Sequence, residues 1–121
     1  DSSRKDLITA VFKAICFQTL EIIDALEQDG VTVNALKVDG GMVKNNKFLQ
    51  LLSNILSTDI QKPDQIESTA VGAFKIALLG SGIKKLNEIS EIGAYEKIHT
   101  QPSSKLADEY DTWKSFLTKN L

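Results

Sequence analysis

The residues best suited to chemistry lie in the segment VDGGMVKNN, residues 38–46, where two glycines precede two asparagines. Gly40 and Gly41 have no β-carbon, so a ligand can lie directly against the main chain there. A short strand is expected before the glycines and a helix after them, and the free N–H groups of a first helical turn attract phosphate oxygens. Asn45 or Asn46 could hydrogen-bond a ribose or a base edge. These features fit a nucleotide site.

A simple turn explains the same residues. Glycines are common between a strand and a helix for conformational reasons, and spacing alone favours this explanation. The segment contains neither the GxxxxGK[ST] nor the GxGxxG pattern of known phosphate-binding loops. Asp39 is expected to cap the turn rather than to bind a ligand. Both explanations therefore remain open from the residues alone.

Other reactive residue types do not form a recognisable site. His99 is the only histidine and has no cysteine near it in sequence, so neither a metal site nor a catalytic triad is expected. Cys16 lies in an apolar stretch and is expected to be a buried structural thiol. Asp108, Glu109 and Asp111 are expected to form a solvated helix face.

Composition limits the class of protein. The 121 residues suit one modest domain, with a formal net charge of −2 and no basic stripe interleaved with aromatic residues, so a nucleic-acid partner is not expected. No apolar run reaches the roughly 20 residues that cross a bilayer. A single cysteine cannot form an internal disulfide, which favours a reducing compartment. We expect a cytoplasmic protein without a membrane partner.

Hydrophobic periodicity predicts alternating helices and strands, and hence an α/β fold. Helices are expected at residues 3–28, 44–56, 68–79 and 103–119, and strands at 33–38, 58–61 and 94–99. So few strands make a small sheet. We expect it to be completed by another chain or by strands that precede Asp1 in a longer protein.

Three segments together carry a family resemblance. They are ICFQT (residues 15–19), LKVDGGMVKNNKFLQLLSNIL (36–56) and KPDQIESTAVGAFKIALLGSG (62–82). In this order and spacing the chain resembles the C-terminal domain of the FGGY family of sugar and polyol kinases, most closely the glycerol kinases among them. Residues 83–121 match only loosely.

The resemblance implies a partial actin-like, ribonuclease H-like ATPase domain with short parallel strands and flanking helices. Residues 1–121 would be a fragment of the C-terminal nucleotide-binding domain, without the N-terminal domain. Gly40, Gly41 and Asn45 match family positions that contact ATP, and Mg²⁺ is implied with it. The implied parent reaction is ATP-dependent phosphorylation of glycerol to glycerol 3-phosphate.

The resemblance also implies what this chain lacks. The family's catalytic aspartate, phosphate loop and acceptor contacts would precede Asp1, so no catalytic residue and no metal ligand is assigned here, and the fragment alone is expected to be inactive. Two positions depart from the family pattern: Met42 replaces a smaller residue, and Leu20 stands where glycerol kinases commonly have arginine.

Three alternatives and one physical consequence follow. The acceptor could be glycerol or, in another FGGY sugar kinase, a pentulose, reached through the missing N-terminal domain. The chain could instead be a non-catalytic α/β interaction module. Exposed strand edges and apolar helix faces lead us to expect self-association of the fragment.

Overall fold

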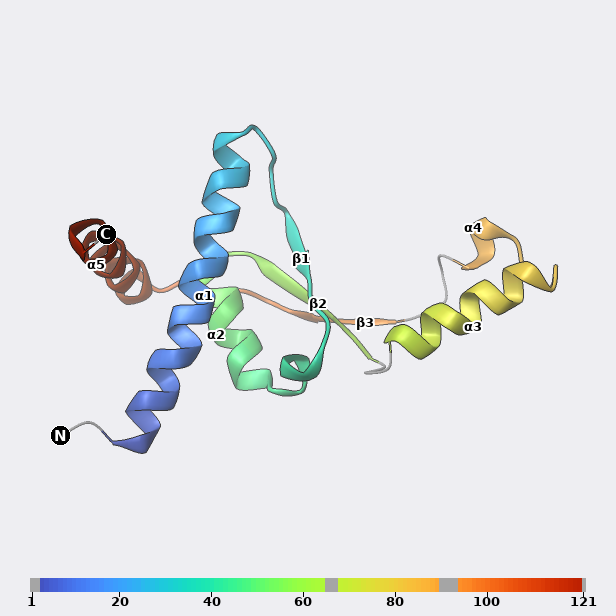
Figure 1. Ribbon diagram of the computed structural model, residues 1–121, viewed down its shortest axis with the longest axis horizontal. Coiled ribbons are helices and arrows are strands. Elements are labelled where there is room, and N and C mark those ends of the chain that lie inside the picture. Colours follow the sequence, from blue (N-terminus) through green and yellow to red (C-terminus); the bar gives the residue numbers. More distant parts are fainter. Residues whose placement is uncertain (1–2, 65–67, 90–93, 121) are drawn as a thin grey trace.

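The computed structural model describes residues 3–64, 68–89 and 94–120, and Figure 1 shows their path. The elements follow in the order α1 (Arg4–Gln28), β1 (Ala35–Lys37), the 3₁₀ helix η1 (Gly41–Lys44), α2 (Asn46–Leu56), β2 (Asp59–Pro63), α3 (Ser68–Gly80), α4 (Leu86–Ile89), β3 (Tyr95–Ile98) and α5 (Ser104–Asn120). The four long helices and the three strands occur near their predicted positions. The short helices η1 and α4 were not predicted.

Local sequence signals define both ends of α1. The Ser3 hydroxyl accepts a hydrogen bond from the Asp6 N–H at 3.2 Å, and the Asp6 carboxylate accepts one from the Ser3 N–H at 2.9 Å. This reciprocal pair is a capping box. It also holds the pKa of Asp6 below its usual value, because the hydrogen bonds from Ser3 favour the ionised carboxylate. After Asp29 the chain leaves the helix through Gly30, whose φ is +85°.

The three strands form a mixed sheet in the order β1-β2-β3. β1 and β2 are parallel, whereas β2 and β3 are antiparallel, so the expectation of parallel strands is wrong for β3. A parallel β3 would need a crossover packed over the sheet. Instead the chain returns beside the end of β2, where the Asp64 N–H donates to the Ala94 carbonyl at 3.1 Å. The strands β2 and β3 therefore pair like the two arms of a hairpin.

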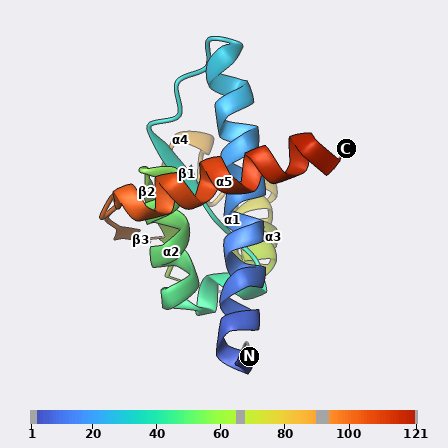
Figure 2. The same ribbon diagram turned by 90° about the vertical axis from the view of Figure 1, so that its left-hand side faces the viewer.

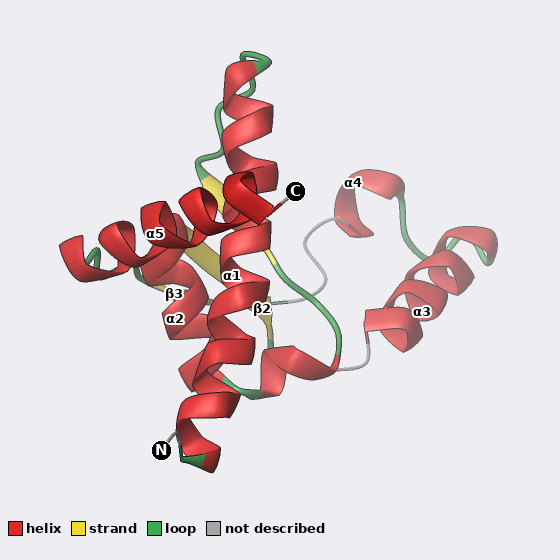
Figure 3. Ribbon diagram, turned by 60° about the vertical axis from the view of Figure 1, so that its left-hand side comes forward, coloured by secondary structure: helices red, strands yellow, loops and turns green. Residues whose placement is uncertain are grey.

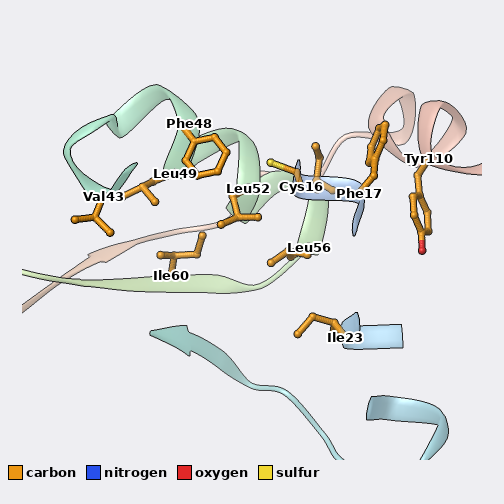
Figure 4. Packing of buried hydrophobic residues seen from close by; sticks show 11 residues of the cluster. Cys16, Phe17, Ile23, Val43, Phe48, Leu49, Leu52, Leu56, Ile60 and Tyr110 are labelled. Carbon is orange, nitrogen blue, oxygen red and sulfur yellow. The ribbon is translucent and has the colours of Figure 1, made fainter. Parts of the chain in front are cut away.

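The core lies between the sheet and α2. Leu36, Ile60 and Ile98 are aligned across the three strands, and Ile60 is completely buried. Figure 4 shows the apolar side chains of α2 above Ile60, with residues of α1 beside them. The buried members from α2 are Phe48, Leu49, Leu52, Ile55 and Leu56. Their spacing places them on one face of the helix, as predicted from periodicity.

A second contact joins α5 to α1, and Figure 2 shows α5 crossing α1. The ring of Phe17 lies 5.6 Å from the rings of both Tyr110 and Trp113. The Tyr110 hydroxyl donates to the Asp24 carboxylate at 2.8 Å, and Lys13 forms an ion pair with Glu109. Tyr110 and Trp113 thus serve in packing between the two helices. Burial, together with the hydrogen bond to Asp24, raises the pKa of Tyr110.

The helices α3 and α4 pack on each other and stand away from the sheet (Figures 1 and 3). No side chain of α3 described by the structure is fully buried. The large apolar side chains exposed in this region are Phe74, Ile76, Leu79, Ile83 and Leu86. This part of the chain therefore presents an unusual amount of apolar surface.

Candidate functional site

Gly40 has a conformational reason to be glycine. Its φ is +97°, a left-handed backbone conformation that side chains disfavour. The Asp39 carboxylate accepts a hydrogen bond from the Gly40 N–H at 2.7 Å, and the Gly40 carbonyl accepts one from the Val43 N–H at 3.2 Å. Asp39 therefore caps the turn, in agreement with the prediction. The turn explanation accounts fully for Gly40.

Gly41 has no such reason. Its φ lies outside the positive range, and a β-carbon built on it would meet no atom within 4 Å. Neither the backbone nor the packing of the described residues requires glycine at this position. Open space beside a main-chain segment is what a ligand needs for close approach.

The predicted helix start at residue 44 is corrected by η1, which lies between the glycines and α2. The buried side chain of Val43 holds this short helix against the core. Asn45 is the N-cap of α2, and its Oδ1 accepts a hydrogen bond from the Phe48 N–H at 3.1 Å. Its amide oxygen thus already accepts one hydrogen bond. Its NH₂ group is the part that can donate to a ligand.

Asn46 makes a different contact. Its Oδ1 accepts a hydrogen bond from Nζ of Lys62 at 2.8 Å, which joins the first residue of α2 to β2. Sequence reasoning did not single out Lys62. Its position two residues after the buried Ile60 was the available signal, because alternate residues of a strand share a face.

A hollow of about 510 Å³ opens between η1 and the adjoining ends of β2 and β3. Its polar lining consists of Lys44, Asn46, Lys62, Asp64 and Glu96. Gly40, Gly41 and Asn45 do not line it. The structure therefore brings the three predicted residues together in one turn but not around this hollow.

The remaining candidate residues have structural surroundings. Cys16 is completely buried, which raises the pKa of its thiol to about 12. His99 is exposed, with Nδ1 3.5 Å from the Asp59 carboxylate. Hydrogen bonds from Lys97 and from the Thr100 N–H lower the pKa of Asp59. The expected solvated acidic face is wrong for Glu109, which is half-buried against Lys13.

Within residues 3–64, 68–89 and 94–120, no group of three or more histidine, cysteine, aspartate or glutamate side chains is placed to hold a metal ion. None of the helices in these ranges combines the length and apolar character that a membrane crossing requires.

Comparison with known protein families decides the family. The model of the C-terminal domain of the FGGY family of carbohydrate kinases matches residues 1–81, which is most of the chain and includes the glycine turn. The chain belongs to this family. The resemblance predicted from the three sequence segments is thereby confirmed, and the match includes all of α1, η1 and α2.

Several curated relatives are glycerol kinases. The chain is 33% identical to glycerol kinase 1 of Pseudomonas aeruginosa over 90% of its length, and 43% identical to the glycerol kinase of Corynebacterium kroppenstedtii over 80%. It is 32% identical to the glycerol kinase of Coxiella burnetii over its whole length. It spans only 22%, 19% and 25% of these three relatives.

Solved structures agree on the fold. The whole chain superposes on a quarter of Plasmodium falciparum glycerol kinase, solved with ADP, with a TM-score of 0.82 and 28% identity. Xylulose kinase from Lactobacillus acidophilus matches 93% of the chain with a TM-score of 0.69 and 23% identity, which concerns the fold alone. These likenesses confirm the predicted α/β, actin-like ATPase fold.

The surroundings of Cys16 predict how its thiol behaves. It should react with a disulfide reagent at pH 8 far more slowly in the folded chain than in urea. Burial keeps the folded thiol neutral. Between pH 9.0 and about 12 the Cys16 thiol therefore ionises only in the unfolded chain. The free energy of unfolding should therefore fall as pH rises through this range. Urea titrations at several pH values measure it.

The Cys16→Ala variant is the control, since it lacks the thiol. Its free energy of unfolding should decline less than that of the native sequence above pH 9.0. Equal slopes for the two proteins, or rapid labelling of the folded chain, would contradict the buried environment of Cys16.

Proposed function

We propose that this chain forms part of the nucleotide-binding domain of a glycerol kinase-like enzyme, and that Gly40, Gly41 and Asn45 contact ATP or ADP. The observation that carries the proposal is the position of Gly41, a glycine without a positive φ or a packing neighbour, in the turn between β1 and α2. A ligand can lie directly against its main chain there. The turn also follows the carboxyl end of β1, where α/β sheets bind ligands.

The three residues have different roles in this proposal. Gly40 gives the turn its shape through its positive φ, and Gly41 provides the surface on which the nucleotide lies. Asn45 donates a hydrogen bond from its amide NH₂ group, because its Oδ1 already caps α2. The ADP in the structure of the Plasmodium falciparum relative supports a nucleotide as the ligand of the proposed enzyme.

The rest of the reaction requires residues outside this chain. Phosphoryl transfer needs a carboxylate that orients the acceptor hydroxyl, Mg²⁺, and donors around the transferring phosphate. The described residues provide no cluster that fits Mg²⁺, and we assign no catalytic residue. We therefore propose that residues 1–121 act together with a further N-terminal domain in a cytoplasmic enzyme that phosphorylates glycerol, and that they are inactive alone.

The open edge of β1 and an exposed side of α1 support the proposal of a further domain. The Val38 N–H bonds to the Gln61 carbonyl, so strand alternation directs the N–H groups of Ala35 and Lys37 toward the open edge of β1. One side of α1 is also exposed. Its large apolar residues there are Leu7, Ile8, Val11, Ile15, Ile22 and Leu26. We propose that this edge and these residues contact additional strands in the longer enzyme, and that the isolated chain self-associates through them.

A graded series at Gly41 tests the nucleotide contact in the full-length protein. Gly41→Ala should weaken ADP binding, and Gly41→Val should weaken it further, by about tenfold or more, which corresponds to about 1.4 kcal/mol. The melting temperature without nucleotide should change little, because an added β-carbon meets no atom within 4 Å. Calorimetric titration with ADP measures the affinities. Unchanged affinity in folded variants would favour the interaction module.

The acceptor is identified with the same full-length protein. Glycerol should be phosphorylated with a higher kcat/KM than pentuloses such as xylulose, as the glycerol kinase relatives lead us to expect. A coupled assay for ADP release gives both values. A higher kcat/KM for a pentulose would contradict glycerol as the acceptor and would leave the proposed nucleotide site unaffected.

Self-association is tested with the 121-residue chain. Light scattering at micromolar concentrations should reveal dimers or larger species. Ala35→Pro removes an N–H from the open edge of β1 and should shift the distribution toward monomer, whereas an exposed substitution on α5, Thr112→Ser, should not. A monomeric native chain across this range would contradict the proposal.

A further inference from the structure

Lys62 connects the end of the glycine turn to the sheet. Its Nζ lies 2.8 Å from Oδ1 of Asn46 and 2.8 Å from a carboxylate oxygen of Glu96. The Lys62 side chain is only 15% exposed, in contrast to the 55% exposure of Glu96. A lysine with two polar partners and a largely covered stem is held in one place.

The strand geometry explains why Lys62 reaches the turn. Ile60 faces α2, and Lys62, two residues later, lies on the same face of the sheet. Glu96 is directly opposite Lys62 in the antiparallel pair. The cation therefore lies beneath the start of α2, where Asn46 follows the N-cap residue Asn45.

We infer that Lys62 is a positioning residue for the nucleotide site, which fixes the Asn46 end of the glycine turn against β2 and β3. This inference rests on the proposed function. Asp39 and Val43 hold the turn at its beginning and middle, and Lys62 holds its end. A turn held at these points presents Gly41 and the Asn45 amide in a fixed arrangement, which lowers the entropic cost of binding.

The test compares variants of the full-length protein by calorimetric titration with ADP. Lys62→Met keeps the apolar stem and removes both polar contacts, and it should weaken ADP binding about fivefold. Lys62→Arg can bond both partners and should stay within about twofold of the native affinity. The melting temperature of each protein without nucleotide separates altered positioning from loss of the fold.

Lys97→Met is the matched control. Lys97 lies on β3 and pairs with Asp59 at 2.9 Å, so this variant removes another lysine–carboxylate contact between the same two strands, away from the turn. ADP affinity should be unchanged. Equal weakening by Lys97→Met and Lys62→Met, or failure of Lys62→Arg to retain binding, would overturn the positioning role.

A variant of the other partner covers the case in which Lys62→Met does not fold. Asn46→Ala removes the acceptor on the turn, keeps Lys62, and should weaken ADP binding to a similar extent. An Asn46→Ala variant that binds ADP as tightly as the native protein would overturn the inference. If Gly41→Val also leaves the affinity unchanged, the nucleotide site itself is wrong. If only Gly41→Val weakens binding, the positioning role alone fails.

Discussion

The contact between α2 and Ile60 is the constraint on which the arrangement depends. Ile60 is completely buried in the middle strand, and Leu36 and Ile98 continue the same apolar row on either side. Since α2 packs on this row, the position of its first residues is determined by the sheet (Figure 4). The glycine turn joins β1 to that helix, so the site inherits its geometry from the core rather than from its own loop.

The two glycines of the turn illustrate how structure separates explanations that sequence leaves together. Both lack a side chain, yet Gly40 is needed for a positive φ and Gly41 is not. A sequence pattern shows that a position is glycine but not why glycine is needed there. The space beside both glycines is open, so the backbone angle is what distinguishes them: it explains the glycine at position 40 and leaves the one at position 41 without a conformational reason.

Local signals made much of the fold predictable. The capping box at Ser3 and the apolar period of α1 and α2 depend on residues within a few positions of each other, so these helices were found with small boundary errors. The antiparallel direction of β3 depends on where the chain travels after β2, which no local pattern records. The helix η1 is too short to have a detectable period.

The residues of the candidate site differ in how they can be recognised from the sequence. Gly40, Gly41 and Asn45 were predicted as site residues because they lie in one short segment that resembles a family motif, but the capping role of Asn45 required its contact with Phe48 to be seen. Lys62 was missed because its partner Asn46 is 16 residues away, and lysine on a strand is ordinarily a solvated residue. Contacts across such separations arise from strand alternation and helix placement together.

The hairpin-like pairing of β2 and β3 has a consequence for how this domain can vary. The bond between the Asp64 N–H and the Ala94 carbonyl closes the ladder at the point where the chain departs toward α3. Insertions or deletions beyond that bond leave the strand register intact, because the paired residues have already been fixed. A change in the length of the segment between Asp64 and Ala94 would therefore leave β2, and the glycine turn on the other side of the sheet, in place.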